Sequence, residues 1–174
     1  VASGDTDISD ASTIPVSVVL NDAAGNSSPA FTTSPLAANS PGIDGHVPTI
    51  SSVTFSPTSG MRKIGDTITM TINSDGTGYT AGTITVNGKA ATGFASGAGN
   101  TYTVTYTVAS GDTDIADASQ IPVSVVLIDA AGNSSPAFTT SPAFGISPGI
   151  DGHAPTGTIT SNATNAGILK IGNS

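Results

Sequence analysis

The chain has 174 residues and a formal net charge of −8, from twelve acidic and four basic residues. Every acidic residue is Asp, and the chain has no Glu, Cys or Trp. This charge disfavours binding to nucleic acid or to an anionic membrane surface. No apolar run approaches the roughly 20 residues that a membrane-inserted helix needs. Abundant Thr, Ser, Val, Gly and Asn favour strands and tight turns over helices.

Residues 1–49 are repeated as residues 108–156, at an offset of 107, with 41 of the 49 positions identical. A period near 100 residues is that of a whole small domain and is too long for one unit of a solenoid. We therefore expect a tandem array. Its parts are the C-terminal part of one repeat (1–40), a linker (41–48), a complete repeat (49–147), a second linker (148–155) and the N-terminal part of a third repeat (156–174).

The complete repeat is expected to contain seven short strands. They are residues 49–55, 66–73, 83–86, 89–94, 101–108, 121–128 and 135–144. Alternation of Thr with apolar residues in the second and fifth of these indicates half-buried strands, and Asn87-Gly88 suits a type I′ hairpin turn. The predicted core consists of Ile68, Met70, Ile72, Ile84, Val86, Tyr102, Val104, Tyr106, Val123, Val125 and Leu127. The predicted fold class is all-β: tandem seven-stranded antiparallel immunoglobulin-like sandwiches, one complete and two partial.

Several motifs resemble those of bacterial immunoglobulin-like tandem repeats. They are a linker Asp44, Pro48-Thr49, Gly65-Asp66, and Val123-Ser124-Val125 followed by Asp129-Ala130-Ala131-Gly132-Asn133. Such repeats build the stalks of large secreted adhesins and other surface proteins of bacteria. The resemblance implies an extracellular location at the bacterial cell surface. It also implies neighbouring repeats, of the same or of identical chains, as partners, and calcium at the junctions between repeats.

The positions of the Asp residues predict calcium independently of the resemblance. In such a sandwich, the loops after the second and sixth strands lie at one pole, and the loop after the fifth lies at the other, beside the outgoing linker. Carboxylates about 8 Å apart repel by roughly 2 kcal/mol at an effective dielectric constant near 20. Ca²⁺ takes six to eight oxygen ligands and would relieve this repulsion. The expected ligands are Asp5, Asp7, Asp10, Asp44, Asp75, Asp129 and Asn133 at the first junction, and Asp112, Asp114, Asp117 and Asp151 at the second.

Blander interpretations of the same residues stay open. Each Asp could serve only to form a turn, and His46 and His153, which are equivalent in the two linkers, could be exposed polar residues or zinc ligands. The Thr row at 101, 103, 105 and 107 fits the solvent face of a strand, although it could also bind a sugar or a regular surface. A carbohydrate-binding module would need an aromatic platform, which the sequence does not offer.

The sequence predicts that the chain is not an enzyme, because it contains no Cys nucleophile, no phosphate-binding loop and no zinc-ligand pair. Two functions stay open. One is a calcium-stiffened stalk that extends an adhesin from the cell, with a distal ligand that this sequence does not identify. The other is a subunit of a surface filament or surface layer, in which neighbouring chains complete the partial immunoglobulin-like domains.

Overall fold

The computed structural model describes residues 1–34 and 40–158. The described residues contain strands and no helix, so none of them forms an apolar helix of membrane-spanning length. Most of the expected third repeat (156–174) lies outside the described residues. The strands are β1 (Ile50–Ser56), β2 (Met61–Lys63), β3 (Thr67–Ser74), β4 (Thr80–Val86), β5 (Lys89–Ala90), β6 (Thr92–Ser96), β7 (Thr101–Thr107), β8 (Val123–Ile128) and β9 (Gly149–Asp151).

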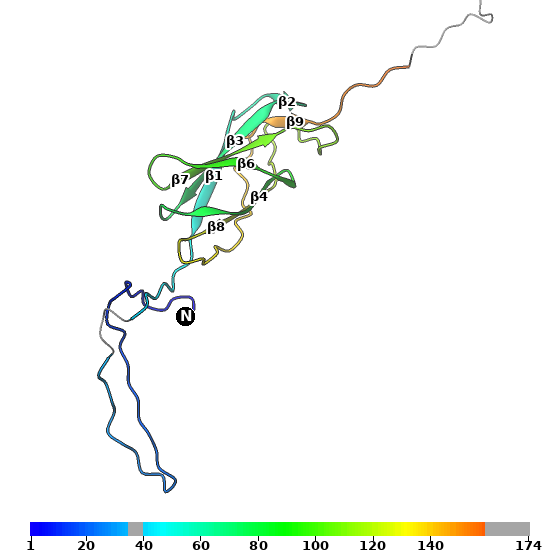
Figure 1. Ribbon diagram of the computed structural model, residues 1–174. Coiled ribbons are helices and arrows are strands. Elements are labelled where there is room, and N and C mark those ends of the chain that lie inside the picture. Colours follow the sequence, from blue (N-terminus) through cyan, green and yellow to red (C-terminus); the bar gives the residue numbers. More distant parts are fainter. Residues whose placement is uncertain (35–39, 159–174) are drawn as a thin grey trace, which may run out of the picture.

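The strands form two antiparallel sheets and one short parallel pair (Figure 1). The larger sheet has the order β1-β3-β7-β6, the smaller has the order β5-β4-β8, and β2 pairs with β9. Residues 134–138 extend the smaller sheet through two isolated bridges to β8, Ile128 with Ser134 and Val125 with Phe138. The fold is therefore all-β, as predicted. The described residues form nine strands, so the predicted count of seven continuous strands is not confirmed.

The core lies between the two sheets and draws on both. All eleven residues predicted for it are at most 6% exposed, which confirms the assigned faces of the strands. The alternation explains this result, because successive side chains of a strand point to opposite faces. Ile68, Met70 and Ile72 of β3 are fully buried, while Thr69 and Thr71 between them are half-buried. The core also contains buried residues that were not predicted: Val53, Phe55, Val108, Ile121 and Ile150.

The predicted hairpin around Asn87 and Gly88 is confirmed. Both residues have positive φ, 52° and 74°, as a type I′ turn requires. The strand before the turn, β4, begins at Thr80, three residues earlier than expected. Its pairing with β8 shifts register between Ala81 and Ile84, and the Gly82 between them lies against Val126, where a side chain would not fit.

The final part of the domain differs most from the prediction. Residues 135–144 make only the bridge at Phe138, which fits a segment containing Pro136 and Pro142, because proline has no N–H to donate to a ladder. The chain pairs again at β9, inside the expected linker, where Ile150 is fully buried. Gly149 allows this close approach, since a Cβ there would lie 2.8 Å from the backbone nitrogen of Asp117.

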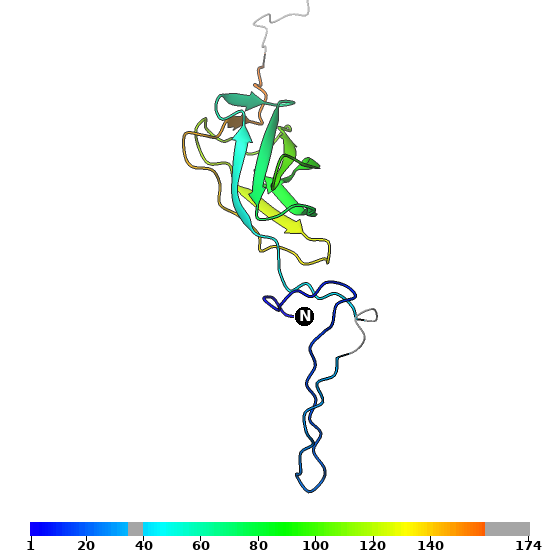
Figure 2. The ribbon, with the colours of Figure 1, turned by 90° about the vertical axis from the view of Figure 1, so that its left-hand side faces the viewer.

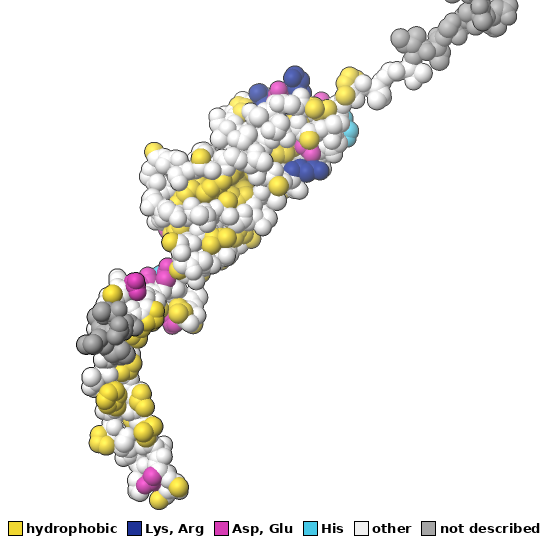
Figure 3. All heavy atoms as spheres, in the orientation of Figure 1, with side chains coloured by type: hydrophobic (Ala, Val, Ile, Leu, Met, Phe, Trp, Pro, Cys, Tyr) yellow, Lys and Arg dark blue, Asp and Glu magenta, His cyan; other side chains and the backbone are white. Residues whose placement is uncertain are grey.

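Residues 1–34 form a long, two-stranded excursion away from the domain. Isolated antiparallel bridges join Val18 to Phe31 and Asn21 to Ser27. Figures 1 and 2 show that this hairpin, here called the N-terminal hairpin, leaves one end of the domain, while residues 152–158 leave the opposite end. Its apolar side chains stand in solvent (Figure 3): Leu20 is 70% exposed and Phe31 60% exposed.

Candidate metal centres at the two junctions

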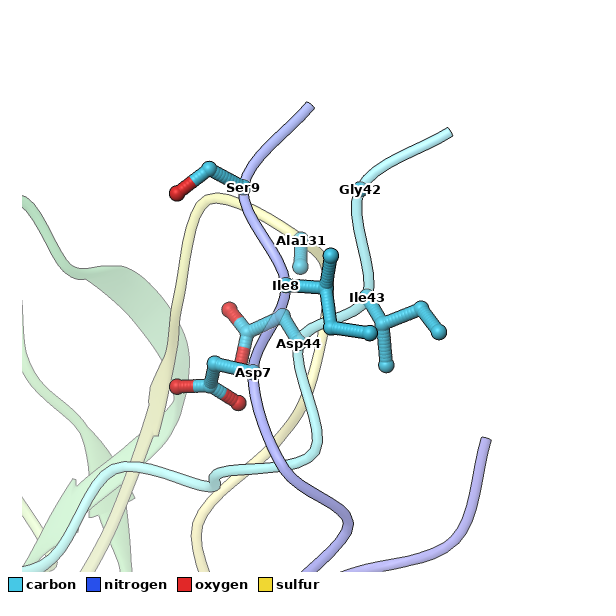
Figure 4. Close-up of a pocket in the computed structure, with 7 residues that line it drawn as sticks. All are labelled: Asp7, Ile8, Ser9, Gly42, Ile43, Asp44 and Ala131. Carbon is cyan, nitrogen blue, oxygen red and sulfur yellow. The ribbon is translucent and has the colours of Figure 1, made fainter. Parts of the chain in front are cut away.

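Three potential ligand side chains meet where the N-terminal hairpin joins the linker. One ligand atom from each of Asp7, Asp44 and His46 lies within 4.8 Å of the others. An antiparallel bridge between Ile8 and Ile43 sets Asp7 beside the linker. Figure 4 shows the Asp7 and Asp44 carboxylates close together, with the Ile8 and Ile43 side chains directed elsewhere. The alternation of an extended chain thus separates the polar group from its apolar neighbours.

Backbone and side-chain hydrogen bonds hold this first group in place. Oδ1 of Asp7 accepts a hydrogen bond from the backbone N–H of Gly45, at 2.9 Å, and lies 2.8 Å from Nδ1 of His46. Oδ1 of Asp44 accepts from the backbone N–H of His46 at 3.1 Å. A side chain on Gly45 would collide with Asp5, so the glycine is what lets the linker lie against the loop.

The second junction repeats the arrangement with the equivalent residues. Asp114, Asp151 and His153 place ligand atoms within 4.8 Å of one another. Oδ1 of Asp114 accepts from the backbone N–H of Gly152 at 2.8 Å and lies 3.0 Å from Nδ1 of His153. The first group draws its loop Asp from the exposed N-terminal hairpin, and the second draws its loop Asp from the complete domain. The local sequence is therefore sufficient to build the group in two different surroundings.

The first junction also gathers carboxylates from the complete domain. A cavity of about 290 Å³ between the linker and the domain is lined by Asp7, Asp44, His46, Val47, Pro48, Thr49, Asp75, Tyr79 and Asp129. Asp75 follows β3 and Asp129 follows β8, which are the two loops expected at this pole. The backbone carbonyl oxygen of Asp44 accepts a hydrogen bond from Nδ2 of Asn133 at 3.3 Å, which ties the linker to the loop after β8.

The carboxylates of the complete domain already have donors in this cavity. Oδ1 of Asp75 accepts from the backbone N–H of Thr49 and from the hydroxyl of Tyr79, both at 3.0 Å. Partial burial, together with the bond to Asp75, raises the pKa of Tyr79 to about 12, so the phenol stays protonated. Asp129 accepts from the backbone N–H groups of Ala131 and Asn133, the pattern of a turn-forming Asp.

In each of the two groups, an Asp carboxylate and a His imidazole shift each other's pKa. The backbone N–H of Gly45 and the His46 ring lower the pKa of Asp7. In return, the hydrogen bond and the charge of Asp7 raise the pKa of His46 above its ordinary value of 6.5. At the second junction, His153 and the N–H of Gly152 lower the pKa of Asp114, and Asp114 raises that of His153. Both Asp side chains are therefore anionic at neutral pH and available to a cation.

Besides Asp75, Asp129 and Asn133, four other predicted ligands lie outside these two groups. Asp5 accepts from the backbone N–H of Ala2, and Asp10 from that of Ala11. Asp117 accepts from the backbone N–H of Gly60, which ties its loop to β2. Asp112 is 1% exposed and points inward, where Oδ2 accepts from the Tyr106 hydroxyl at 2.6 Å.

The two histidines, considered from the sequence as exposed linker residues or zinc ligands and not as part of the calcium sites, each belong to one of the groups. Their spacing in the sequence could have indicated this. His46 and His153 are equivalent positions of the repeat, and each follows a linker Asp by two residues. Two carboxylates and an imidazole, exposed and close together, can ligate a divalent cation, with further oxygen ligands from the cavity at the first junction.

Comparison of the chain with protein-family models, with curated proteins and with solved structures gives no match.

Proposed function

We propose that this chain is a structural repeat region of an extracellular bacterial surface protein, a stalk stiffened by Ca²⁺ at the junctions between repeats. The observation that carries the proposal is the first junction, where carboxylates from the hairpin, the linker and two domain loops line one cavity. A cation held there would connect three parts of the chain that otherwise meet through a few hydrogen bonds. The equivalent group at the second junction supports a device repeated along an array.

The strand order supports the immunoglobulin-like interpretation of the domain. In that fold the first, second, fifth and fourth strands form one sheet, and the third, sixth and seventh form the other. The order β1-β3-β7-β6 matches the first sheet. The pairing of β4 with β8, and of β8 with residues 134–138, matches the second. In this interpretation β2 and β9 are the outer parts of the first and seventh strands, and β5 is a short addition.

The direction of the two connections supports an extended stalk. The chain enters the domain at one end and leaves at the other (Figures 1 and 2), so successive repeats would follow one another along an axis. Short linkers that contain Pro48 and Pro155 restrict the backbone at both ends. A rod of this kind suits a protein that carries a binding domain away from the cell.

Calorimetric titration of the whole chain with Ca²⁺ tests the proposal. Extracellular calcium modules bind with constants near 10⁻⁴–10⁻³ M. At about 10 mM free Ca²⁺, one site would therefore stabilise the folded state by roughly 1.4–2.7 kcal/mol. We expect Asp44→Asn to abolish binding at the first junction and to remove its share of the calcium-dependent rise in melting temperature.

The matched control is Asp22→Asn. Asp22 is also an exposed loop Asp that accepts backbone hydrogen bonds from Ala24 and Asn26, but it lies in the turn of the N-terminal hairpin, away from either group. It should leave the calcium response intact. Absence of heat at millimolar Ca²⁺, or an equal effect of both substitutions, would reject calcium as the junction ligand. A response to Zn²⁺ alone would assign the groups to a different metal.

A further inference from the structure

The sequence contains one Asn-Gly pair, Asn87-Gly88, which forms the turn between β4 and β5. Such a pair is chemically labile, because the backbone nitrogen of the second residue can attack the side-chain amide carbon of the first. Gly has no Cβ to hinder this approach. The attack closes a succinimide ring and releases the side-chain nitrogen as ammonia. Water then opens the ring and leaves Asp, or the isomer whose backbone runs through the side chain.

In the folded domain the side-chain amide of Asn87 is buried and holds two hydrogen bonds. The residue is 7% exposed. Its Nδ2 donates to the backbone carbonyl oxygen of Thr113 at 2.8 Å and to the hydroxyl oxygen of Tyr106 at 3.4 Å. The nitrogen that leaves during deamidation is the one that makes both bonds, so the reaction has to break them. We therefore expect folding to slow the reaction.

The same hydrogen-bond network does not suit a carboxylate in place of the amide. Tyr106 has one hydroxyl hydrogen, which it donates to Oδ2 of Asp112 at 2.6 Å. Burial and this bond raise the pKa of Tyr106 to about 12, so the phenol stays protonated. A carboxylate at position 87 would face the Tyr106 and Thr113 oxygens without a hydrogen for either. It would also repel the buried Asp112, beside which the single charge of Lys89 lies 3.7 Å away.

The segment that Asn87 holds is the one that binds the outgoing linker. On one side of Thr113, the backbone N–H of Gly111 donates to the carbonyl oxygen of Gly152 at 2.8 Å. On the other side, the backbone N–H of Ile115 donates to the carbonyl oxygen of Ile150 at 2.9 Å. The bond from Asn87 to Thr113 lies between these two contacts. Losing it would therefore loosen the attachment of the linker to the domain.

We propose that Asn87 is a deamidation site that folding protects, and that its conversion to a carboxylate releases residues 109–115 and loosens the outgoing linker. The reaction needs only water as co-reactant. The chain loses ammonia when the ring closes and gains water when the ring opens, so an amide becomes an acid without any redox step. The turn, Tyr106 and Thr113 all lie outside the two metal groups. The inference therefore does not depend on calcium or on the proposed stalk.

The rate of deamidation tests the protection by the fold. The full chain is kept under mildly alkaline conditions, either folded or in urea, and peptide mapping by mass spectrometry follows the conversion of Asn87. We expect conversion to be at least about tenfold slower in the folded chain, because it requires local opening. Asn26 is the internal reference, since it lies in an exposed turn and its rate should change far less. Equal rates at Asn87 in the folded and unfolded chain would overturn the proposal.

The full-length variant Asn87→Asp tests the consequence. It should unfold at lower urea concentration and show several-fold faster hydrogen exchange at the Gly111 and Ile115 amides, measured by NMR. The matched control is Gln120→Glu, the same change of amide to acid at an exposed side chain that donates to the carbonyl oxygen of Pro142. Failure of Asn87→Asp to fold, while Gln120→Glu folds, would support the proposal, because the network would then not hold the carboxylate. Equal stability and equal exchange in the two variants would overturn it.

Discussion

Asp residues have two distinct roles in this chain, and comparing equivalent positions of the two repeat copies distinguishes these roles. Asp112 is buried and accepts hydrogen bonds from the Tyr106 hydroxyl and the backbone N–H of Ala109. Its equivalent Asp5 is exposed and accepts only from Ala2 among the bonds described. Asp7 and Asp114, two residues further on, face the linkers in both copies. The same motif therefore supplies an inward structural carboxylate and an outward candidate ligand.

Replacing the inward carboxylate should cost stability without changing calcium binding. Asp112→Ala leaves the Tyr106 hydroxyl and the Ala109 N–H without their acceptor, and an unsatisfied buried group costs about 1–3 kcal/mol. Urea unfolding should show this loss, with no change in the calcium titration. Asp5→Ala is the control at the equivalent exposed position and should change the free energy of unfolding by less than about 0.5 kcal/mol. Equal losses from the two substitutions would contradict the distinction.

The His46 imidazole should make calcium binding at the first junction dependent on pH. Asp7 raises the pKa of His46, so the imidazolium persists to higher pH than in a free histidine. Its positive charge beside Asp7 opposes a cation. Binding should therefore weaken as pH falls through this raised pKa and strengthen as pH rises above it. Calorimetry between about pH 5.5 and 8 should show a smaller slope for His46→Gln. An unchanged slope would remove His46 from the group.

At the scale of strands, the sequence predicted what depends on alternation and on turn chemistry. The faces of β3, β7 and β8 followed from period-two patterns, and the turn at Asn87-Gly88 followed from its residue pair. The β2–β9 pair was not predicted. Its three-residue strands, Met61–Lys63 and Gly149–Asp151, are too short to show a hydrophobic alternation, and their pairing depends on tertiary contact. The group at each junction was predicted in part, from its Asp residues.

The unequal environments of equivalent strands give a direct stability test. Leu127→Ala removes a fully buried side chain and should destabilise the domain by about 2–5 kcal/mol. Leu20→Ala, at the equivalent position of the N-terminal hairpin, removes a side chain that is 70% exposed. In dilute solution it should change the midpoint of thermal unfolding very little. A comparable loss from Leu20→Ala would mean that the hairpin is packed in solution.

For the whole molecule, the junction is the part on which the proposed stalk depends. The domain has its own core. Each linker is held to the loop beside it mainly by short backbone hydrogen bonds, such as Gly4 N–H to Gly45 O at the first junction and Gly111 N–H to Gly152 O at the second. Such bonds set a local conformation but leave exposed carboxylates facing one another. A bound cation would convert this repulsion into attraction and fix the angle between neighbouring repeats.

The most direct measurement of this claim is the distance distribution across the first junction with and without calcium. Because the chain lacks cysteine, spin labels can be placed at Ser3→Cys, in the exposed turn next to the linker, and at Ala98→Cys, in the exposed loop before β7. If Ca²⁺ stiffens the junction, the distance distribution is broad in the presence of a chelator and narrow at about 10 mM Ca²⁺, with no narrowing in Asp44→Asn. Distributions of the same width in both conditions would show that calcium does not set the stiffness of the junction, and the proposed stalk mechanism would be wrong.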